Sequence, residues 1–159
     1  MEQKKRVEQT ISKEIKEQIS RTKERGRCCD TDPTKDDPPG FTNIQATDRR
    51  PNANKIRVDA LVAHNCGIRN VWIYPVKVTV DAGGNDVYNF IQNPPGTAVV
   101  QEVTPTSPCD PPTTPFQVQH DFNIAGLYVA GDTASFEIVP MSCCGEYPNP
   151  GQYTNKIVI

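Results

Sequence analysis

Residues 55–63 read KIRVDALVA and residues 71–81 read VWIYPVKVTVD. In the first stretch, apolar side chains alternate with polar or charged ones: Ile56, Val58, Ala60 and Val62 against Lys55, Arg57 and Asp59. In the second, the alternating set is Trp72, Tyr74, Val76, Val78 and Val80. Successive side chains of a strand point to opposite faces, so this period of two predicts two β-strands. The sequence Ala82-Gly83-Gly84-Asn85 then predicts a hairpin turn.

Similar short segments continue to the end of the chain, each separated from the next by turn residues. We expect strands in residues 86–92, 97–104, 116–124, 133–140 and 153–159, with a further short one in 126–130. The chain has 15 prolines and 10 glycines, which favours strands and turns over helices. Together these signals predict an all-β body over residues 41–159. We expect a single β-sandwich of jelly-roll or immunoglobulin-like type.

Residues 1–27 have a different character. Val7, Ile11, Ile15 and Ile19 recur every four residues within a strongly charged segment. One apolar residue per turn is too narrow a stripe to form a wall of a core, so we predict a helical or disordered arm. The arm would become a stable helix only in a homo-oligomer or against another surface protein. Gly26 is interpreted as the stop of that helix.

Charge is divided unequally between the arm and the body. Residues 1–27 contain nine Lys/Arg and five Glu, a net charge of +4, whereas the rest of the chain has eight Lys/Arg and fourteen Asp/Glu, a net charge of −6. Opposite charges of this kind favour attraction between copies, screened by salt. An acidic body repels phosphate, so nucleic acid is not an expected partner.

The segment 28–40 joins the arm to the body. It begins with Cys28-Cys29 and continues as DTDPTKDDPPG (residues 30–40). Proline-rich linkers hold extended conformations of about 3 Å per residue, which predicts a stiff spacer of roughly 30 Å. Such a spacer would carry Cys28 and Cys29 onto another subunit.

The chain has six cysteines, yet its N-terminus carries no secretion signal and no stretch is long enough for a membrane span. Cytoplasmic thiols usually stay free or bind metal. Three explanations remain open: metal binding, a leader absent from this sequence, or oxidation after the protein leaves the cell by another route.

The cysteines form two vicinal pairs and two single positions: Cys28, Cys29, Cys66, Cys109, Cys143 and Cys144. A bond between adjacent cysteines needs a strained ring, so members of a pair are expected to bond to different partners. All six fall in predicted loops or strand ends, where thiols are expected to be accessible. We predict disulfides, within or between chains, and the spacing leaves fifteen connectivities open.

Metal binding and catalysis have weaker support. No C-x-x-C knuckle occurs, and His64 with Cys66 is the best candidate for a zinc half-site, which one of the cysteine pairs would complete. His120 alternates with Val118 and Phe122 and is interpreted as a half-buried strand residue. No nucleophile, phosphate-binding or dinucleotide motif occurs. We therefore expect no enzyme activity, no metal and no cofactor.

The combination of Cys28-Cys29, the spacer to Gly40 and a strand-rich body with further loop cysteines resembles the subunits of bacterial endospore appendage (Ena) fibres. In that family an N-terminal connector bearing a Cys-Cys pair docks on the preceding subunit and is locked by intermolecular disulfides. The resemblance implies that Cys28 and Cys29 bond to two of Cys66, Cys109, Cys143 and Cys144 on neighbouring subunits. The long charged arm and the second pair, Cys143-Cys144, depart from that pattern.

The leading functional hypothesis is a structural subunit that assembles with itself into a fibre, ring or surface appendage. The body would be joined to its copies by the N-terminal arm and by intermolecular disulfides, at an extracellular, spore or virion surface. One alternative is a binding or adhesion module with intrachain disulfides, contacting its ligand through loops 105–115 and 141–151. Another is a viral or phage structural protein of jelly-roll type.

Overall fold

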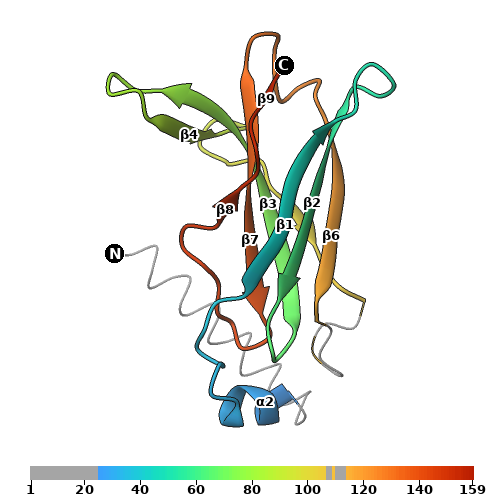
Figure 1. Ribbon diagram of the computed structural model, residues 1–159, viewed down its shortest axis with the longest axis vertical. Coiled ribbons are helices and arrows are strands. Elements are labelled where there is room, and N and C mark those ends of the chain that lie inside the picture. The colour runs from blue at the N-terminus through green and yellow to red at the C-terminus, as the bar shows by residue number, and fades with distance from the viewer. Residues whose placement is uncertain (1–24, 107–108, 110–113) are drawn as a thin grey trace.

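The computed structural model describes residues 25–106, 109 and 114–159, and most of the predicted arm (residues 1–27) lies outside this part of the chain. The described residues form an all-β body of two curled antiparallel sheets, with one short helix at its base (Figure 1). This arrangement confirms the predicted β-sandwich. The elements are α2 (Arg25–Thr31), β1 (Gly40–Asp48), β2 (Lys55–Ala63), β3 (Ile68–Val80), β4 (Asp86–Phe90), β5 (Gln101–Val103), β6 (Phe116–Asn123), β7 (Thr133–Ser142), β8 (Gln152–Tyr153) and β9 (Ile157–Val158).

The smaller sheet has the order β1–β2–β6, so β2 is its central strand. Val58 of β2 lies opposite Ala46 on one side and His120 on the other. The register of β1 shifts between Thr42 and Gln45. Asn43, with a φ of 53°, lies in this irregular stretch, in the left-handed region that Asn tolerates better than most residues.

The larger sheet is organised around the 13-residue strand β3. Strand β7 pairs along one side of β3, while β4 and β5 pair with different parts of its other side. The short strands β8 and β9 extend the sheet beyond β7. The chain therefore crosses between the sheets after β2, between β5 and β6, and again between β6 and β7.

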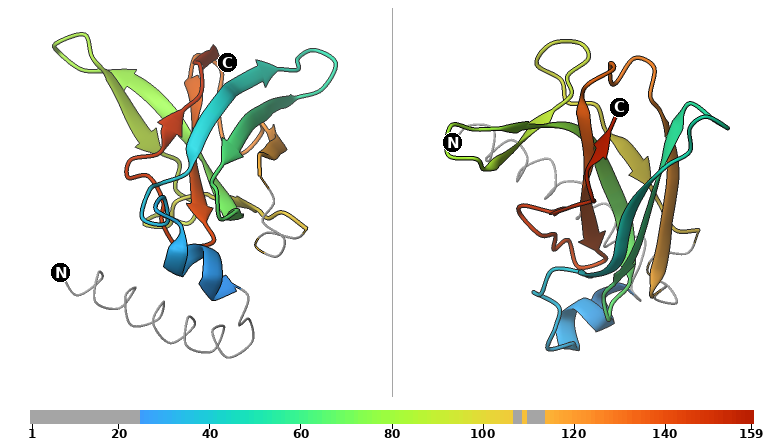
Figure 2. Two further views of the ribbon diagram at one scale, coloured as in Figure 1. Left: turned by 60° about the horizontal axis from the view of Figure 1, so that its bottom comes forward. Right: turned by 45° about the horizontal axis from the view of Figure 1, so that its top comes forward.

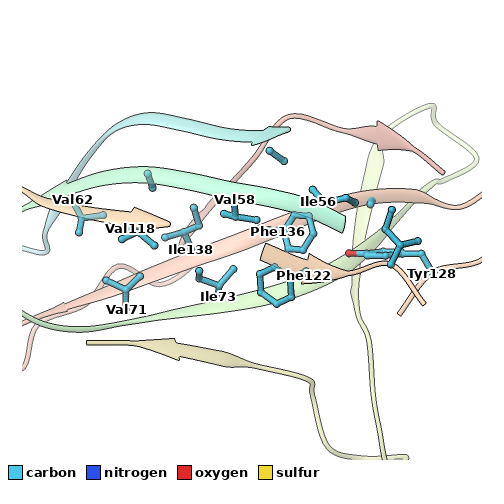
Figure 3. Close-up of a cluster of buried hydrophobic side chains, with 14 of the residues drawn as sticks. Ile56, Val58, Val62, Val71, Ile73, Val118, Phe122, Tyr128, Phe136 and Ile138 are labelled. Atoms are coloured by element: carbon cyan, nitrogen blue, oxygen red, sulfur yellow. The ribbon is translucent and has the colours of Figure 1, made fainter. Parts of the chain in front are cut away.

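The hydrophobic core lies between the two sheets (Figure 3). Strand β2 supplies Ile56, Val58, Ala60 and Val62, each with no exposed surface, as the alternation in residues 55–63 predicts. The larger sheet contributes Val71, Ile73, Phe136 and Ile138 to the same core. Burying an aliphatic or aromatic side chain of this size contributes about 1.5–3 kcal/mol, so this double layer accounts for much of the stability of the body.

Strand β3 is apolar on both faces. Val71 and Ile73 belong to the core between the sheets, whereas Trp72 and Tyr74 lie half-buried on the opposite, outer face of the larger sheet. The alternating residues that begin with Trp72 therefore lie on the outer face of the larger sheet. Val71 and Ile73, at the intervening positions, pack in the core.

Several segments differ from the sequence-based expectation. Gly26 does not end a helix but lies inside α2. Residues 30–40 are not an extended spacer: after α2, the N–H groups of Lys35 and Asp37 donate to the carbonyl oxygens of Asp32 and Thr34, which makes consecutive turns. Residues 126–130 form a turn instead of a strand.

Tyr128 explains why residues 126–130 turn. Its N–H donates to the carbonyl oxygen of Ile124, and its ring enters the core beside Phe136, with 5% of the residue exposed. A turn places this side chain under the end of the sandwich, which a strand continuing from β6 would not do.

No helix in the described part of the chain has the length and hydropathy of a membrane span.

Candidate functional site

Helix α2 lies at the base of the sandwich (Figure 2), and two of the three disulfides attach to it. All six cysteines are paired within the chain, as Cys28–Cys66, Cys29–Cys144 and Cys109–Cys143. The two members of each vicinal pair bond to different partners, which avoids the strained ring that adjacent cysteines would form.

Helix α2 is the element that these bonds attach to the body. Cys28 bonds to Cys66, which lies in the connection between β2 and β3, and Cys29 bonds to Cys144, just beyond β7. The helix therefore ties the crossing between the two sheets to the end of a central strand. The third bond fastens the loop that carries Cys109 to Cys143.

The two bonds that hold α2 lie beside each other. The sulfur atoms of Cys29, Cys66 and Cys144 are all within 4.8 Å of one another. Cys28 and Cys66 form a second group of this kind with a carboxylate oxygen of Asp32. Three sulfur atoms from three separate segments thus lie close together, and the fourth, that of Cys28, is bonded to one of them. We call Cys28, Cys29, Cys66 and Cys144 the sulfur cluster.

His64 fastens the segment between α2 and β1 (residues 32–39, which we call the connector) to the body. Its Nδ1 accepts a hydrogen bond of 3.1 Å from the N–H of Cys66, which leaves Nε2 as the protonated nitrogen. Nε2 donates to the carbonyl oxygens of Thr34 and Asp37, at N–O distances of 3.1 Å and 3.0 Å. His64 is 6% exposed, so these bonds satisfy a buried ring and fix the connector turns above it.

The first connector turn is closed by Asp32 and Thr34. An Asp32 carboxylate oxygen accepts hydrogen bonds from the Thr34 hydroxyl and from the Thr34 N–H. These bonds lower the pKa of Asp32. The Thr34 hydroxyl also accepts a bond of 2.9 Å from the side-chain amide of Asn65, which joins the turn to the β2–β3 connection.

The accessibility that we expected for the cysteines is only partly correct. Cys28, Cys29, Cys109 and Cys144 are half-buried, whereas Cys66 is 1% exposed and Cys143 2% exposed. Loops are usually exposed, but here the helix and the connector cover the β2–β3 connection, so Cys66 is buried beneath its own partner. The cysteines that the resemblance assigned to neighbouring subunits, Cys66 and Cys144 among them, are bonded to α2 of the same chain.

Neither histidine is placed as a metal ligand among the described residues. Both ring nitrogens of His64 are used in hydrogen bonds, and the groups with metal-ligand spacing contain Cys66 but not His64. His120 is half-buried, with its ring edge-to-face against Phe122 at a centroid distance of 4.6 Å. Burial lowers the pKa of His120, which keeps its ring neutral in its strand position.

The outer face of the larger sheet carries a second group that the sequence analysis did not single out. Tyr88 stacks on Tyr153 at a centroid distance of 3.8 Å, and Tyr74 meets Phe90 edge-to-face at 5.5 Å. Glu137 lies among them, 7% exposed, and accepts hydrogen bonds from the Tyr153 hydroxyl and a backbone N–H. The available signal was the period-two placement of aromatic residues in β3 and β4. We call these residues the aromatic face.

Electrostatics on the aromatic face follow from this burial. Desolvation, and then the negative charge of Glu137, raise the pKa of Tyr74 and of Tyr153. Both phenols therefore remain protonated and serve as hydrogen-bond donors over a wide pH range.

Comparisons with protein-family models, curated proteins and solved structures found no match.

Proposed function

We propose that this protein is a structural subunit that assembles with copies of itself by exchanging α2 and its connector between chains. The two disulfides of α2 would then form between neighbouring subunits instead of within one. The observation that carries the proposal is the way α2 is held: two disulfides and the connector fasten it, while it has no extensive packing against any described strand.

An element held in this way suits exchange. Every contact that α2 makes with its own body is available, unchanged, on the body of a second copy, so exchange keeps all the bonds and costs little free energy. A helix packed widely into the core would have to break that packing first. The disulfides then make the assembly permanent, because they close only after the exchanged segment has docked.

The connector has the length for this movement. Residues 32–37 are folded into turns, and the exposed Pro38 leads into β1. If the eight residues 32–39 were extended, they would span about 27 Å, since each residue reaches at most about 3.4 Å. The exchanging unit is then α2 (residues 25–31), and the extended connector gives up its turns and its hydrogen bonds to His64.

The disulfides also bear on where the protein works. Bonds of this kind persist in oxidising surroundings and are rare in the cytoplasm, which supports a place outside the reducing cytoplasm for the folded protein. Within that range, the resemblance to endospore appendage subunits supports the surface of a spore, where subunits of a fibre are linked covalently.

Isotope mixing tests the proposal. Equal amounts of unlabelled and ¹⁵N-labelled chain are combined under reducing conditions, oxidised together, digested and mapped by mass spectrometry. Because Cys28 is next to Cys29 and Cys143 next to Cys144, the digest keeps the three bonds in one cluster of peptides. Exchange predicts that the Cys28-Cys29 peptide differs in label from the peptides that carry Cys66 and Cys144 in about half of the molecules, as random pairing requires. The Cys109–Cys143 peptides serve as the internal control and stay unmixed. Unmixed α2 peptides together with a single monomer band on non-reducing gels would refute the proposal.

A binding or adhesion module is the second candidate, and two observations favour it. All six cysteines are satisfied within one chain, which gives a complete, disulfide-stabilised monomer. The aromatic face also offers half-buried tyrosines with hydroxyl donors, the kind of side chain enriched in binding sites. The same labelling experiment separates the two candidates, because this one predicts unmixed peptides throughout.

A further inference from the structure

We propose that the sulfur cluster is a metal site in the reduced protein. When Cys28, Cys29, Cys66 and Cys144 are thiols, they would bind one zinc ion or another thiophilic divalent metal as a four-thiolate centre. The inference goes beyond the proposed assembly and does not depend on it, because it concerns a single reduced chain.

Geometry is the first argument. A tetrahedral zinc–thiolate site has Zn–S distances of about 2.3 Å, which places its sulfur atoms about 3.8 Å apart. The sulfur atoms of Cys29, Cys66 and Cys144 already lie within 4.8 Å of one another, with Cys28 bonded to Cys66. On reduction, each bonded pair has to separate by about 2 Å to reach the tetrahedral spacing, and the sulfur of Cys28 has also to turn toward those of Cys29 and Cys144. Side-chain rotation supplies movements of this kind.

The origin of the four ligands is the second argument. Cys28 and Cys29 come from one helical turn, and Cys66 and Cys144 come from loops at the ends of β2 and β7. A metal ion bound here would join α2, the β2–β3 connection and the segment after β7. Cys66 is buried, and the other three are half-buried, so the ion would be shielded from competing water.

Asp32 does not replace one of the cysteines. One of its carboxylate oxygens lies within 4.8 Å of the sulfur atoms of Cys28 and Cys66, but the carboxylate is occupied by the two hydrogen bonds from Thr34. Thiolates are also the softer ligands, which thiophilic metals select over oxygen. Asp32 is therefore assigned to the connector turn and the four sulfur atoms to the metal.

Reduction of the two disulfides of the sulfur cluster needs a reductant, and a dithiol compound can supply it. Two dithiol molecules give four electrons and four protons to the two disulfides, which breaks both S–S bonds, forms four thiols and leaves two oxidised dithiols. Binding of one divalent ion then releases the four protons and leaves a centre with a net charge of −2. Two oxidised dithiol molecules reverse the sequence: they take four electrons from the thiolates and four protons from solvent and become dithiols, the metal dissociates, and the two disulfides form again.

The test uses the full chain, reduced without oxygen by a water-soluble phosphine that is removed before metal is added. Cobalt(II) is the spectroscopic probe, because tetrahedral thiolate coordination gives intense visible bands and a sulfur-to-metal charge-transfer band. We expect saturation at one cobalt per chain, displacement of cobalt by zinc, and a higher thermal midpoint for the zinc-loaded reduced chain than for the metal-free one.

Alkylation assigns the ligands. In the zinc-loaded chain, iodoacetamide should modify Cys109 and Cys143 and spare the sulfur cluster, as read by peptide mass spectrometry. The Cys109→Ser/Cys143→Ser variant is the matched control and should keep the cobalt spectrum. Cys29→Ser should weaken cobalt binding on the order of 100-fold or more, beyond the loss expected for a residue outside the coordination shell.

Three results would overturn the proposal. The first is a reduced chain that binds no cobalt, whether or not it stays folded by circular dichroism. The second is a cobalt spectrum that survives Cys29→Ser unchanged. The third is equal alkylation of all six cysteines in the presence of zinc.

Discussion

Removing the Cys29–Cys144 bond gives a sharp test of how α2 is attached. The perturbation is the double variant Cys29→Ser/Cys144→Ser, which deletes one of the two bonds on α2 and leaves no unpaired thiol. Its matched control is Cys109→Ser/Cys143→Ser, which deletes the bond that does not involve the helix.

The expected magnitude depends on which other bonds are present. In the chain-entropy account, a disulfide stabilises by restricting the unfolded chain, and the effect grows with the logarithm of the loop that it closes. By itself, the Cys29–Cys144 bond closes a loop of 115 residues, which corresponds to about 4.8 kcal/mol. The control bond closes a loop of 34 residues, which corresponds to about 3.8 kcal/mol.

In the intact protein, the other two disulfides already shorten the loop that the Cys29–Cys144 bond closes. A path from Cys29 leads through Cys28 to Cys66, along 43 residues (109 − 66) to Cys109, and across to Cys143, next to Cys144. The bond then closes a loop of about 45 residues, and its expected contribution falls to about 4.0 kcal/mol. The two double variants should therefore lose nearly the same free energy of unfolding, although their sequence separations differ more than threefold.

Urea unfolding of the oxidised proteins, followed by the fluorescence of the single Trp72, measures this difference. We expect both variants to lose about 4 kcal/mol, within about 0.5 kcal/mol of each other. A loss below about 1 kcal/mol for the α2 variant alone would show that the bond does not close this loop within the chain. A midpoint that depends on protein concentration would instead indicate that the chains are linked to each other.

Three further predictions concern the body. Gly151→Ala should destabilise the folded protein by about 1–3 kcal/mol, because the new Cβ would clash with the backbone carbonyl oxygen of Ile138 in β7. Gly40→Ala, where a new Cβ would meet no atom within 4 Å, is its control, and equal thermal midpoints for the two variants would contradict the packing. Tyr128→Phe should cost about 1 kcal/mol in urea unfolding, because it removes the buried hydroxyl that donates to a β3 carbonyl oxygen, and an unchanged midpoint would argue against that bond. Burial lowers the pKa of His120 below its ordinary value of 6.5, so the unfolded chain takes up this proton first and the free energy of unfolding should fall as the pH drops below about 6.5. His120→Gln should flatten the dependence of that free energy on pH across this range, and an unaltered pH profile would refute the assignment.

The fold was predictable where local pattern and burial agree. Residues 55–60 alternate strictly, and the apolar residues Ile56, Val58 and Ala60 enter the core. Residues 116–123 follow the same rule, which is why β2 and β6, two of the three strands of the smaller sheet, were predicted almost to the residue. Strand β3 was predicted as a strand, but it is apolar on both faces, so its pattern did not indicate which face meets the other sheet.

The connector was predicted wrongly for a physical reason. Proline-rich segments favour extended chain in isolation. Here two disulfides and the ring of His64 hold the segment against the body, and the Asp32–Thr34 turn forms under that restraint. Long-range bonds of this kind outweigh local preference, and nothing within residues 30–40 encodes them.

The sequence by itself determined the β-sandwich, the position of the cysteines outside the strand interiors and the separation between vicinal partners, because these depend on period, turn chemistry and covalent geometry. Only the tertiary structure decided the pairing of the cysteines, the burial of Cys66 and the closeness of the two disulfides that hold α2. The sulfur atoms come from residues up to 116 positions apart (144 − 28), and their proximity follows from how the two sheets bring the β2–β3 connection and the end of β7 to the same edge.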